Sequence, residues 1–182
     1  MSRVTTFSIT IQDITNLDAV RAVEFFRRLL WNEAAHVGIG KNLINVPDCI
    51  NVGDGGIDAL IKDARPTSEE VIPLGTTGFQ IKSSDLQPME CKRELHQKGQ
   101  LNQPLKPEVK KLLDDGGTYV LVLCAEPSTP RTREDALREE LISQGYPDPK
   151  IRLYTANQLV GFAERLIKLP FLMEFSFTFH GL

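Results

Sequence analysis

Two stretches near the middle of the chain alternate between apolar and polar residues with the two-residue period of a β-strand. They are residues 57–61 (Ile-Asp-Ala-Leu-Ile) and residues 78–82 (Gly-Phe-Gln-Ile-Lys). The alternation predicts an apolar face of Ile57, Ala59, Ile61, Phe79 and Ile81, and an opposite face of Asp58, Leu60, Gln80 and Lys82. If the two strands pair, Asp58, Gln80 and Lys82 share one face, where an acid, an amide and an amine can converge.

A second pattern repeats every 3.6 residues and predicts an amphipathic helix over residues 17–30, with Asn16 or Asp18 as its N-cap. Residues 118–125 are almost continuously apolar, which indicates a strand buried on both faces. The other predicted elements are strands over 4–12, around 43–46 and over 151–154, and helices over 86–98, 107–115, 134–144 and 156–167. This order predicts an α/β sandwich in which a central mixed β-sheet is flanked by helices.

The composition indicates one globular domain. The chain has 182 residues, of which 41% are hydrophobic, enough for a sizeable core. Cys49, Cys91 and Cys124 are scattered, without the spacing of a zinc site or a disulfide framework. The N-terminus lacks an apolar signal region, and no apolar run is long enough to span a bilayer. We therefore expect a cytoplasmic protein without membrane contact.

The net charge changes what can be expected of nucleic-acid binding. A formal charge of −3 is unlike that of a basic coat protein, so contact with DNA has to depend on a local patch. The helices predicted over 86–98 and 107–115 carry basic residues, namely Lys92, Arg93, Lys98, Lys110 and Lys111. These either follow the phosphates of a nucleic acid or are ordinary solvated charges among the acidic residues around them.

The tail, residues 169–182, is rich in Phe and other apolar residues, which is unusual for a free terminus. It either pairs as a final strand or forms the junction to a following domain. We therefore assign residues 1–168 to the domain and treat the tail separately.

The candidate chemistry lies around Asp58. Gly53-Asp54-Gly55-Gly56 has the composition of a turn, in which Asp54 is expected to bond to its own backbone. Asp58, at the start of the following strand, is therefore the better candidate for a catalytic acid. Together, Asp58, Gln80 and Lys82 can hold a divalent cation and steady a phosphate.

Asp-Gly-Gly-Ile-Asp at 54–58 followed by Gln-Ile-Lys at 80–82 resembles the PD-(D/E)XK nuclease superfamily, in its Mrr-like, restriction-endonuclease-like branch. In that branch Gln often replaces the acidic residue of the second half-motif. The resemblance covers residues 16 to 165 and is closest to the N-terminal effector nuclease domains of bacterial antiphage (STAND-type) NTPases. It implies a restriction-endonuclease-like, three-layer α/β sandwich.

The resemblance also implies a division of roles. Mg²⁺, for which Mn²⁺ can substitute, would be bound by Asp58, the side-chain oxygen of Gln80 and the carbonyl of Ile81, while Lys82 would orient the attacking water. Members of the superfamily often place a Glu of the first helix near the metal. Glu24 fits that position and Glu33 is the alternative, although Glu24 can equally be a solvated residue paired with Arg27 or Arg28.

The function implied is Mg²⁺-dependent endonucleolytic hydrolysis of double-stranded DNA with low sequence specificity, by the effector domain of an antiphage defence protein. Two active sites, one for each strand, would give double-strand breaks, so a homo-oligomer, dimer or tetramer, is expected. A C-terminal NTPase or sensor region of a longer protein would control it. Two alternatives stay open: a catalytically silent module for nucleic-acid binding or oligomerisation, and an RNase on the same fold.

Overall fold

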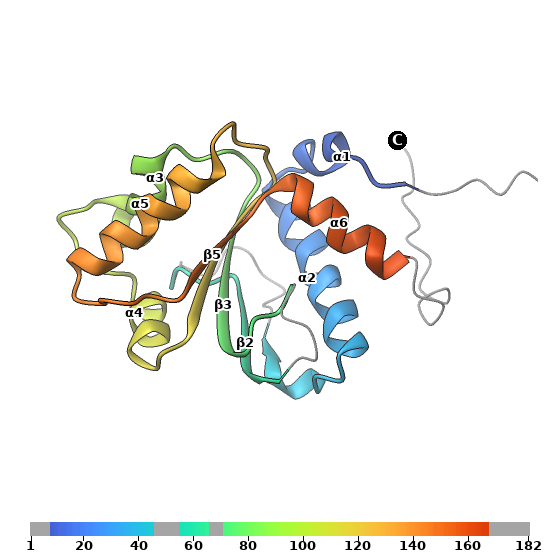
Figure 1. The fold of residues 1–182 in the computed structure, drawn as a ribbon, viewed down its shortest axis with the longest axis horizontal. Helices are drawn as coiled ribbons and strands as arrows, with labels where there is room; N and C mark the ends of the chain where they lie inside the picture. The colour runs from blue at the N-terminus through green and yellow to red at the C-terminus, as the bar shows by residue number, and fades with distance from the viewer. Residues whose placement is uncertain (1–7, 46–54, 66–70, 168–182) are drawn as a thin grey trace, which may run out of the picture.

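A mixed five-stranded β-sheet forms the centre of the molecule (Figure 1). The computed structural model describes residues 8–45, 55–65 and 71–167. The helices are α1 (Ile11–Thr15), α2 (Ala19–His36), α3 (Pro88–Glu94), α4 (Pro107–Asp114), α5 (Pro130–Ser143) and α6 (Ala156–Ile167), with short 3₁₀ turns η1 (Lys41–Leu43) and η2 (Gln97–Gly99). The strands are β1 (Ile44–Asn45), β2 (Ala59–Ala64), β3 (Gly75–Lys82), β4 (Thr118–Leu123) and β5 (Ile151–Tyr154).

The strands lie in the order β1-β2-β3-β4-β5. The pairs β1–β2 and β2–β3 are antiparallel, whereas β3–β4 and β4–β5 are parallel. Parallel neighbours need crossover connections, which are supplied here by α3 and α4 between β3 and β4, and by α5 between β4 and β5. The expected α/β class with a mixed sheet is therefore confirmed.

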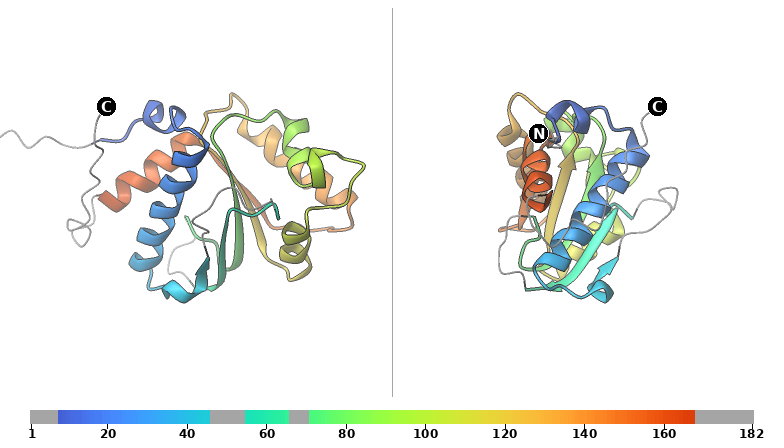
Figure 2. Two further views of the ribbon diagram at one scale, coloured as in Figure 1. Left: turned by 180° about the vertical axis from the view of Figure 1, so that it is seen from behind. Right: turned by 90° about the vertical axis from the view of Figure 1, so that its right-hand side faces the viewer.

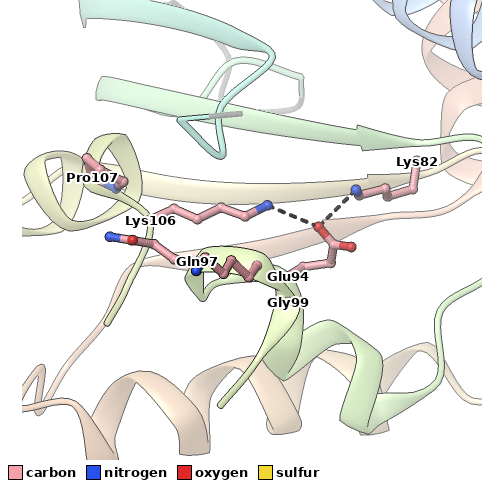
Figure 3. A pocket seen from close by; sticks show the side chains of 7 residues that line it. Lys82, Glu94, Gln97, Gly99, Lys106 and Pro107 are labelled. Carbon is pink, nitrogen blue, oxygen red and sulfur yellow. Dashed lines mark hydrogen bonds and ion pairs between the residues drawn. The ribbon is translucent and has the colours of Figure 1, made fainter. Parts of the chain in front are cut away.

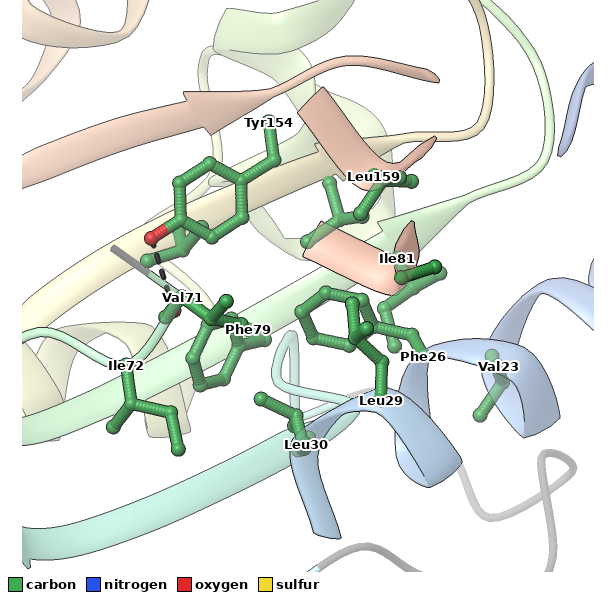
Figure 4. Packing of buried hydrophobic residues seen from close by; sticks show 14 of the residues in the cluster. Val23, Phe26, Leu29, Leu30, Val71, Ile72, Phe79, Ile81, Tyr154 and Leu159 are labelled. Carbon is green, nitrogen blue, oxygen red and sulfur yellow. Dashed lines mark hydrogen bonds between the residues drawn. The ribbon is translucent and has the colours of Figure 1, made fainter. Parts of the chain in front are cut away.

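Helices cover both faces of the sheet, so the described residues form three layers (Figures 1 and 2). On one side α1, α2 and α6 pack on the sheet, and the aromatic ring of Phe26 in α2 lies 5.2 Å from that of Phe79 in β3 (Figure 4). On the other side α3, α4 and α5 cover Tyr119, Leu121 and Leu123 of β4. Every residue of β4 is buried, as its continuous apolar run predicted.

The predicted starts of two helices are confirmed. Asp18 is the N-cap of α2 and accepts a hydrogen bond from the backbone N–H of Arg21 at 2.8 Å. Pro107 occupies the first turn of α4. A backbone N–H at this position has no partner within the helix, so its absence from proline costs no hydrogen bond. The described part of the chain contains no helix that is both long and apolar enough to cross a bilayer.

The structure corrects three predictions of elements. Residues 8–12 do not belong to a strand over 4–12, because Thr10 and Asp13 form a capping box that starts α1 at Ile11. The helix expected over 86–98 ends at Glu94, and the backbone of His96 is extended and forms a bridge with Leu105. Helix α5 begins at Pro130, four residues before the expected start.

A fourth correction concerns the side-chain alternation around Asp58. Strand β2 begins only at Ala59, so Ile57 lies outside the regular period. Ile57 packs with Leu60 in the cluster under α4, whereas Ala59 and Ile61 pack in the cluster under α2. Asp54, Cys49 and the tail 169–182 lie outside the described residues.

Candidate active site

The pairing of β2 with β3 brings Asp58 to the end of β3. Ala59 is paired with Phe79, and one residue earlier the backbone N–H of Asp58 donates to the carbonyl oxygen of Phe79 at 2.8 Å. The carboxylate of Asp58 accepts a hydrogen bond of 2.6 Å from the backbone N–H of Ile81. Ile81 lies between Gln80 and Lys82, so the two halves of the motif meet in space as the strand pattern predicted.

Gln80 is buried and takes part in hydrogen bonds at both ends of its amide. The hydroxyl of Tyr119 donates to its side-chain oxygen at 2.8 Å, and its Nε2 donates to the carboxylate of Glu94 at 2.9 Å. Because a carboxylate can only accept, this arrangement determines which end of the amide carries the oxygen. The oxygen that was expected as a metal ligand therefore faces the Tyr119 hydroxyl.

Tyr119 keeps its proton in this position. Burial, supported by the charges of Glu94 and Asp58, raises the pKa of the phenol well above its ordinary value. Tyr119 thus remains a neutral donor towards Gln80 over the physiological range of pH.

Glu94, at the end of α3, is the acidic residue to which the other side chains converge (Figure 3). One of its oxygens lies 2.8 Å from the ammonium of Lys82 and 3.3 Å from that of Lys106. Burial by itself raises the pKa of Glu94, but the hydrogen bonds and charges of Lys82 and Lys106 outweigh it and lower the pKa below 4.5. Glu94 is therefore ionised at neutral pH.

A pocket of about 520 Å³ opens beside this ion-paired group (Figure 3). It is lined by Lys82 from β3, Glu94 from α3, Gln97, Lys98 and Gly99 from η2, and Lys106 and Pro107 at the start of α4. The pocket therefore lies between the end of β3 and the segment that joins α3 to α4.

Two glycines allow the segment before Asp58 to lie against α4. A Cβ at Gly55 would come within 2.5 Å of the Glu108 side chain, and one at Gly56 within 2.6 Å of the Lys106 side chain. Gly56 also has φ +86°, a conformation that residues with a side chain rarely adopt. The sequence predicted these glycines as turn residues. In the structure they let the segment before Asp58 lie directly against Lys106 and Glu108.

The two glutamates expected from the first helix have partners elsewhere. Glu24 is ion-paired with Arg28 on α2, the helix that packs on the face of the sheet opposite to Gln80 and Lys82. Glu33 is fully buried and lies 2.6 Å from Arg165 of α6. The structure therefore brings Asp58, Gln80 and Lys82 together and gives Glu24 and Glu33 other ion pairs.

The basic residues of the predicted patch have different surroundings in the structure. Lys98 lines the pocket, whereas Lys92 lies 3.0 Å from Glu139 and Lys110 pairs with Asp114.

Cys91 and Cys124 are buried free thiols, and burial raises the pKa of each to about 11. These two cysteines are core residues, and Cys124 belongs to the apolar run of residues 118–125.

The oxygen donors of the site suit a hard divalent cation. Within the described ranges, no group of three or more His, Cys, Asp and Glu side chains is arranged to hold a metal ion. Mg²⁺ is usually held by only one or two carboxylates together with waters and substrate phosphates. Asp58 and Glu94 can provide such carboxylates, so the residues fit Mg²⁺ chemically.

The sequence pattern does not single out Glu94, Lys106 and Tyr119. Glu94 looked like one of several solvated acids on a polar helix, and Lys106 like a loop residue. Tyr119 carries a weak signal, because it is the one aromatic residue with a polar tip in a mostly apolar strand. Only the contacts across the fold distinguish these residues from their neighbours.

The chain matches no family model, and comparisons with curated proteins and with solved structures found no match either.

Proposed function

We propose that this chain is a PD-(D/E)XK-type, Mg²⁺-dependent endonuclease that hydrolyses phosphodiester bonds of double-stranded DNA with low sequence specificity. The observation that carries the proposal is the bond from the Ile81 N–H to the Asp58 carboxylate, which joins the two half-motifs. The mixed sheet between two helical layers is compatible with the restriction-endonuclease-like sandwich that this proposal requires.

The carboxylates of Asp58 and Glu94 would hold the cation, with the carbonyl of Ile81 as a further oxygen donor. When bound, Mg²⁺ supplies Lewis-acid activation of the phosphate and of the attacking water. Lys82 offsets the negative charge that develops on the phosphate and orients the water, because its ammonium is beside Glu94 at the open side of the site.

Gln80 acts as a positioning residue for Glu94 in this proposal. Its oxygen accepts from Tyr119 and its amide donates to Glu94, which supports this role over that of the direct metal ligand expected from the sequence. Glu94 then takes the place of the acid that is absent from position 80. A second group that orients a metal ligand in this way typically contributes 10- to 100-fold to affinity or activity, as an order of magnitude.

Two active sites, one for each strand, would give double-strand breaks, so we propose that the chain acts as a homo-oligomer. Control by an NTPase or sensor region, as in antiphage effectors, is part of the same proposal.

One observation favours a second candidate, a silent nucleic-acid-binding or oligomerisation module. Glu94 pairs with both Lys82 and Lys106, and Gln80 is buried within its hydrogen bonds. Such a network can be purely structural, since buried ion pairs and amides often serve to fix packing.

Cleavage of supercoiled plasmid DNA in Mg²⁺ or in EDTA separates these candidates. We expect metal-dependent cutting by the wild type and a loss of roughly 100-fold or more in Asp58→Asn, Lys82→Met and Glu94→Gln. Glu139→Gln is the matched control, because Glu139 is an exposed acid, paired with Lys92 in the same helical layer.

Cutting that survives in Asp58→Asn and Lys82→Met would show that the assigned site is wrong. A wild type that binds DNA but cuts neither DNA nor RNA would support the silent module. Cutting of RNA alone would support the RNase, for which the same residues and the same metal would serve.

A further inference from the structure

The pocket beside Glu94 has a feature that the proposed hydrolysis does not use. Three of its lining side chains are lysines, Lys82, Lys98 and Lys106, whereas Glu94 is the acid among them. Only Lys82 belongs to the motif. Lys106 is buried, with its side chain 8% exposed, and its ammonium nevertheless reaches Glu94 at the wall of the pocket.

A buried ammonium needs a compensating anion, because removal from water costs several kcal/mol unless the charge is paired. Glu94 serves Lys82 and Lys106 with one and the same oxygen, at 2.8 and 3.3 Å. Two cations thus share one carboxylate, and Lys98 adds a third positive charge nearby. The lining of the pocket therefore has an excess of positive charge.

The segment that carries Lys98 and Lys106 is firmly held. The ring of His96 is fully buried, with Nδ1 2.6 Å from the carbonyl oxygen of Gln103 and Nε2 2.9 Å from the carboxylate of Glu140. The backbone N–H of Lys106 donates to the carbonyl of Leu95 at 2.8 Å. A pocket with such walls is largely formed before any ligand arrives.

Lys98 has an unusual backbone conformation at this position. Its φ of +56° is in the left-handed region, which costs about 1–2 kcal/mol for a residue with a side chain. Strained residues of this kind concentrate at binding and catalytic sites. The conformation places Lys98 at the pocket wall beside Gly99.

We propose that this pocket is a phosphate-binding subsite, in which Lys106 and Lys98 hold a DNA phosphate next to the one that Lys82 serves. The inference rests on the proposed function, since it names how that substrate is held. The volume of about 520 Å³ lies in the range of ligand sites and suits a nucleotide-sized group.

Glu94 competes with this phosphate for Lys106. Lys106 is the more distant of the two lysines that share this oxygen, at 3.3 Å against 2.8 Å for Lys82. A cation held by Glu94 would compete for the oxygen that Lys82 and Lys106 share, and would leave both ammonium groups to phosphates. Binding of the cation and binding of DNA therefore favour each other.

The test measures binding rather than cutting. Affinity for a fluorescent DNA duplex is determined by anisotropy in EDTA over a series of salt concentrations. Each phosphate contact contributes about −0.9 to the slope of log affinity against log salt. We expect Lys106→Met and Lys98→Met each to lose about one phosphate contact, so that the slope becomes shallower by about 0.9. Binding near 0.1 M salt should be five- to tenfold weaker, as an order of magnitude.

Lys150→Met is the matched control, because it removes the same charge from an exposed lysine just before β5, where the ammonium lies 3.2 Å from the carbonyl of Gly116. It is expected to leave the slope unchanged. Glu94→Gln is expected to strengthen binding in EDTA, since it removes the competitor of the phosphate. Thermal unfolding of each variant checks that it is folded, and exposed Lys98 provides a variant with little risk to folding.

Equal slopes for Lys106→Met, Lys98→Met and Lys150→Met would overturn the subsite, as would a wild type that binds duplex RNA but not DNA. Weaker binding by Glu94→Gln would overturn the competition. Failure of the nuclease proposal is distinguishable from failure of the subsite. A protein that cuts no DNA can still bind it with a salt dependence that Lys106→Met reduces.

Discussion

Gln80 lies in the middle of a chain of hydrogen bonds that runs from the Tyr119 hydroxyl to the Glu94 carboxylate. Each member determines the orientation of the next: the neutral phenol can donate, the amide accepts and donates, and the carboxylate accepts. At the scale of the residue, Gln80 is therefore accompanied by an acid supplied from α3.

We expect Tyr119→Phe to lower the free energy of unfolding by about 1–3 kcal/mol, because the buried oxygen of Gln80 loses its donor. Cleavage should fall about tenfold, since Glu94 is less well oriented. Tyr146→Phe is the control: its hydroxyl donates to the half-exposed Asp114, which water can serve instead, so the loss should stay below about 1 kcal/mol. Urea unfolding and plasmid cleavage measure both effects, and equal losses would contradict the proposed chain.

The ion pairs of Glu94 should be visible in the pH dependence of stability. Its folded-state pKa lies below the ordinary value of 4.5, so these pairs stabilise fully above that pH and are lost as the pH falls through the folded-state pKa. The difference in unfolding free energy between the wild type and Glu94→Gln should be largest near neutral pH and shrink below pH 4.5. Glu139→Gln should differ little from the wild type at every pH, because its ion pair is exposed.

At the scale of the element, the site depends on how the segment before β2 lies on the first turn of α4. The carbonyl of Gly55 accepts a bond of 3.2 Å from the backbone N–H of Glu108, and Gly56 faces Lys106 and Val109. This contact holds Asp58 and Lys106 on one side of the site. The same region of sequence, seen alone, is only a glycine-rich turn.

Gly56→Ala and Gly145→Ala separate close packing from backbone strain. Both residues have positive φ, +86° and +96°, but a Cβ at Gly145 meets nothing within 4 Å. Gly145→Ala should cost about 1–2 kcal/mol for the backbone alone. Gly56→Ala should cost about 1–3 kcal/mol more, and should reduce cleavage, because Lys106 and Val109 must move. Urea unfolding compares them, and a similar cost for both would argue against the close approach.

The connection between α3 and α4 shows why a helix prediction can run too far. Residues 86–98 are polar and compatible with a helix, but His96 is drawn into the interior between Gln103 and Glu140. The buried hydrogen bonds outweigh the continuation of the helix. The result is the turn that carries Gln97, Lys98 and Gly99 into the pocket lining.

At the scale of the whole molecule, the sheet separates two apolar clusters. Ile61 of β2 is buried in the cluster under α2, and Ile151 of β5 in the cluster beside α5. Because the clusters lie on opposite faces, changes in one should be independent of changes in the other.

We expect Ile61→Val and Ile151→Val each to lower the unfolding free energy by about 0.5–1.5 kcal/mol. In the double variant the losses should add to within about 0.5 kcal/mol, with one cooperative transition. Urea unfolding followed by fluorescence and by circular dichroism tests this. Two separate transitions would mean that the two layers unfold independently.

Much of the fold and part of the site follow from local pattern. The 3.6-residue period of α2, the apolar run of β4 and the two faces of β3 all depend on neighbours in sequence, and all are found. The convergence of Asp58 with Gln80 and Lys82 needed only that two adjacent strands pair. The strand over 4–12 was wrong because β-rich composition does not reveal a capping box that starts a helix.

The mixed α/β architecture and the meeting of Asp58 with residues 80–82 thus follow from local pattern, because periodicity decides which side chains an element presents to each side. That Glu94 and Tyr119, which are 14 and 39 residues from Gln80, join the same group of hydrogen bonds follows only from the packing of the folded chain. It also brought Lys106 beside Lys82. Contacts of this range arise from the packing of whole elements, and a polar helix or an apolar strand carries no mark of the partner it will meet.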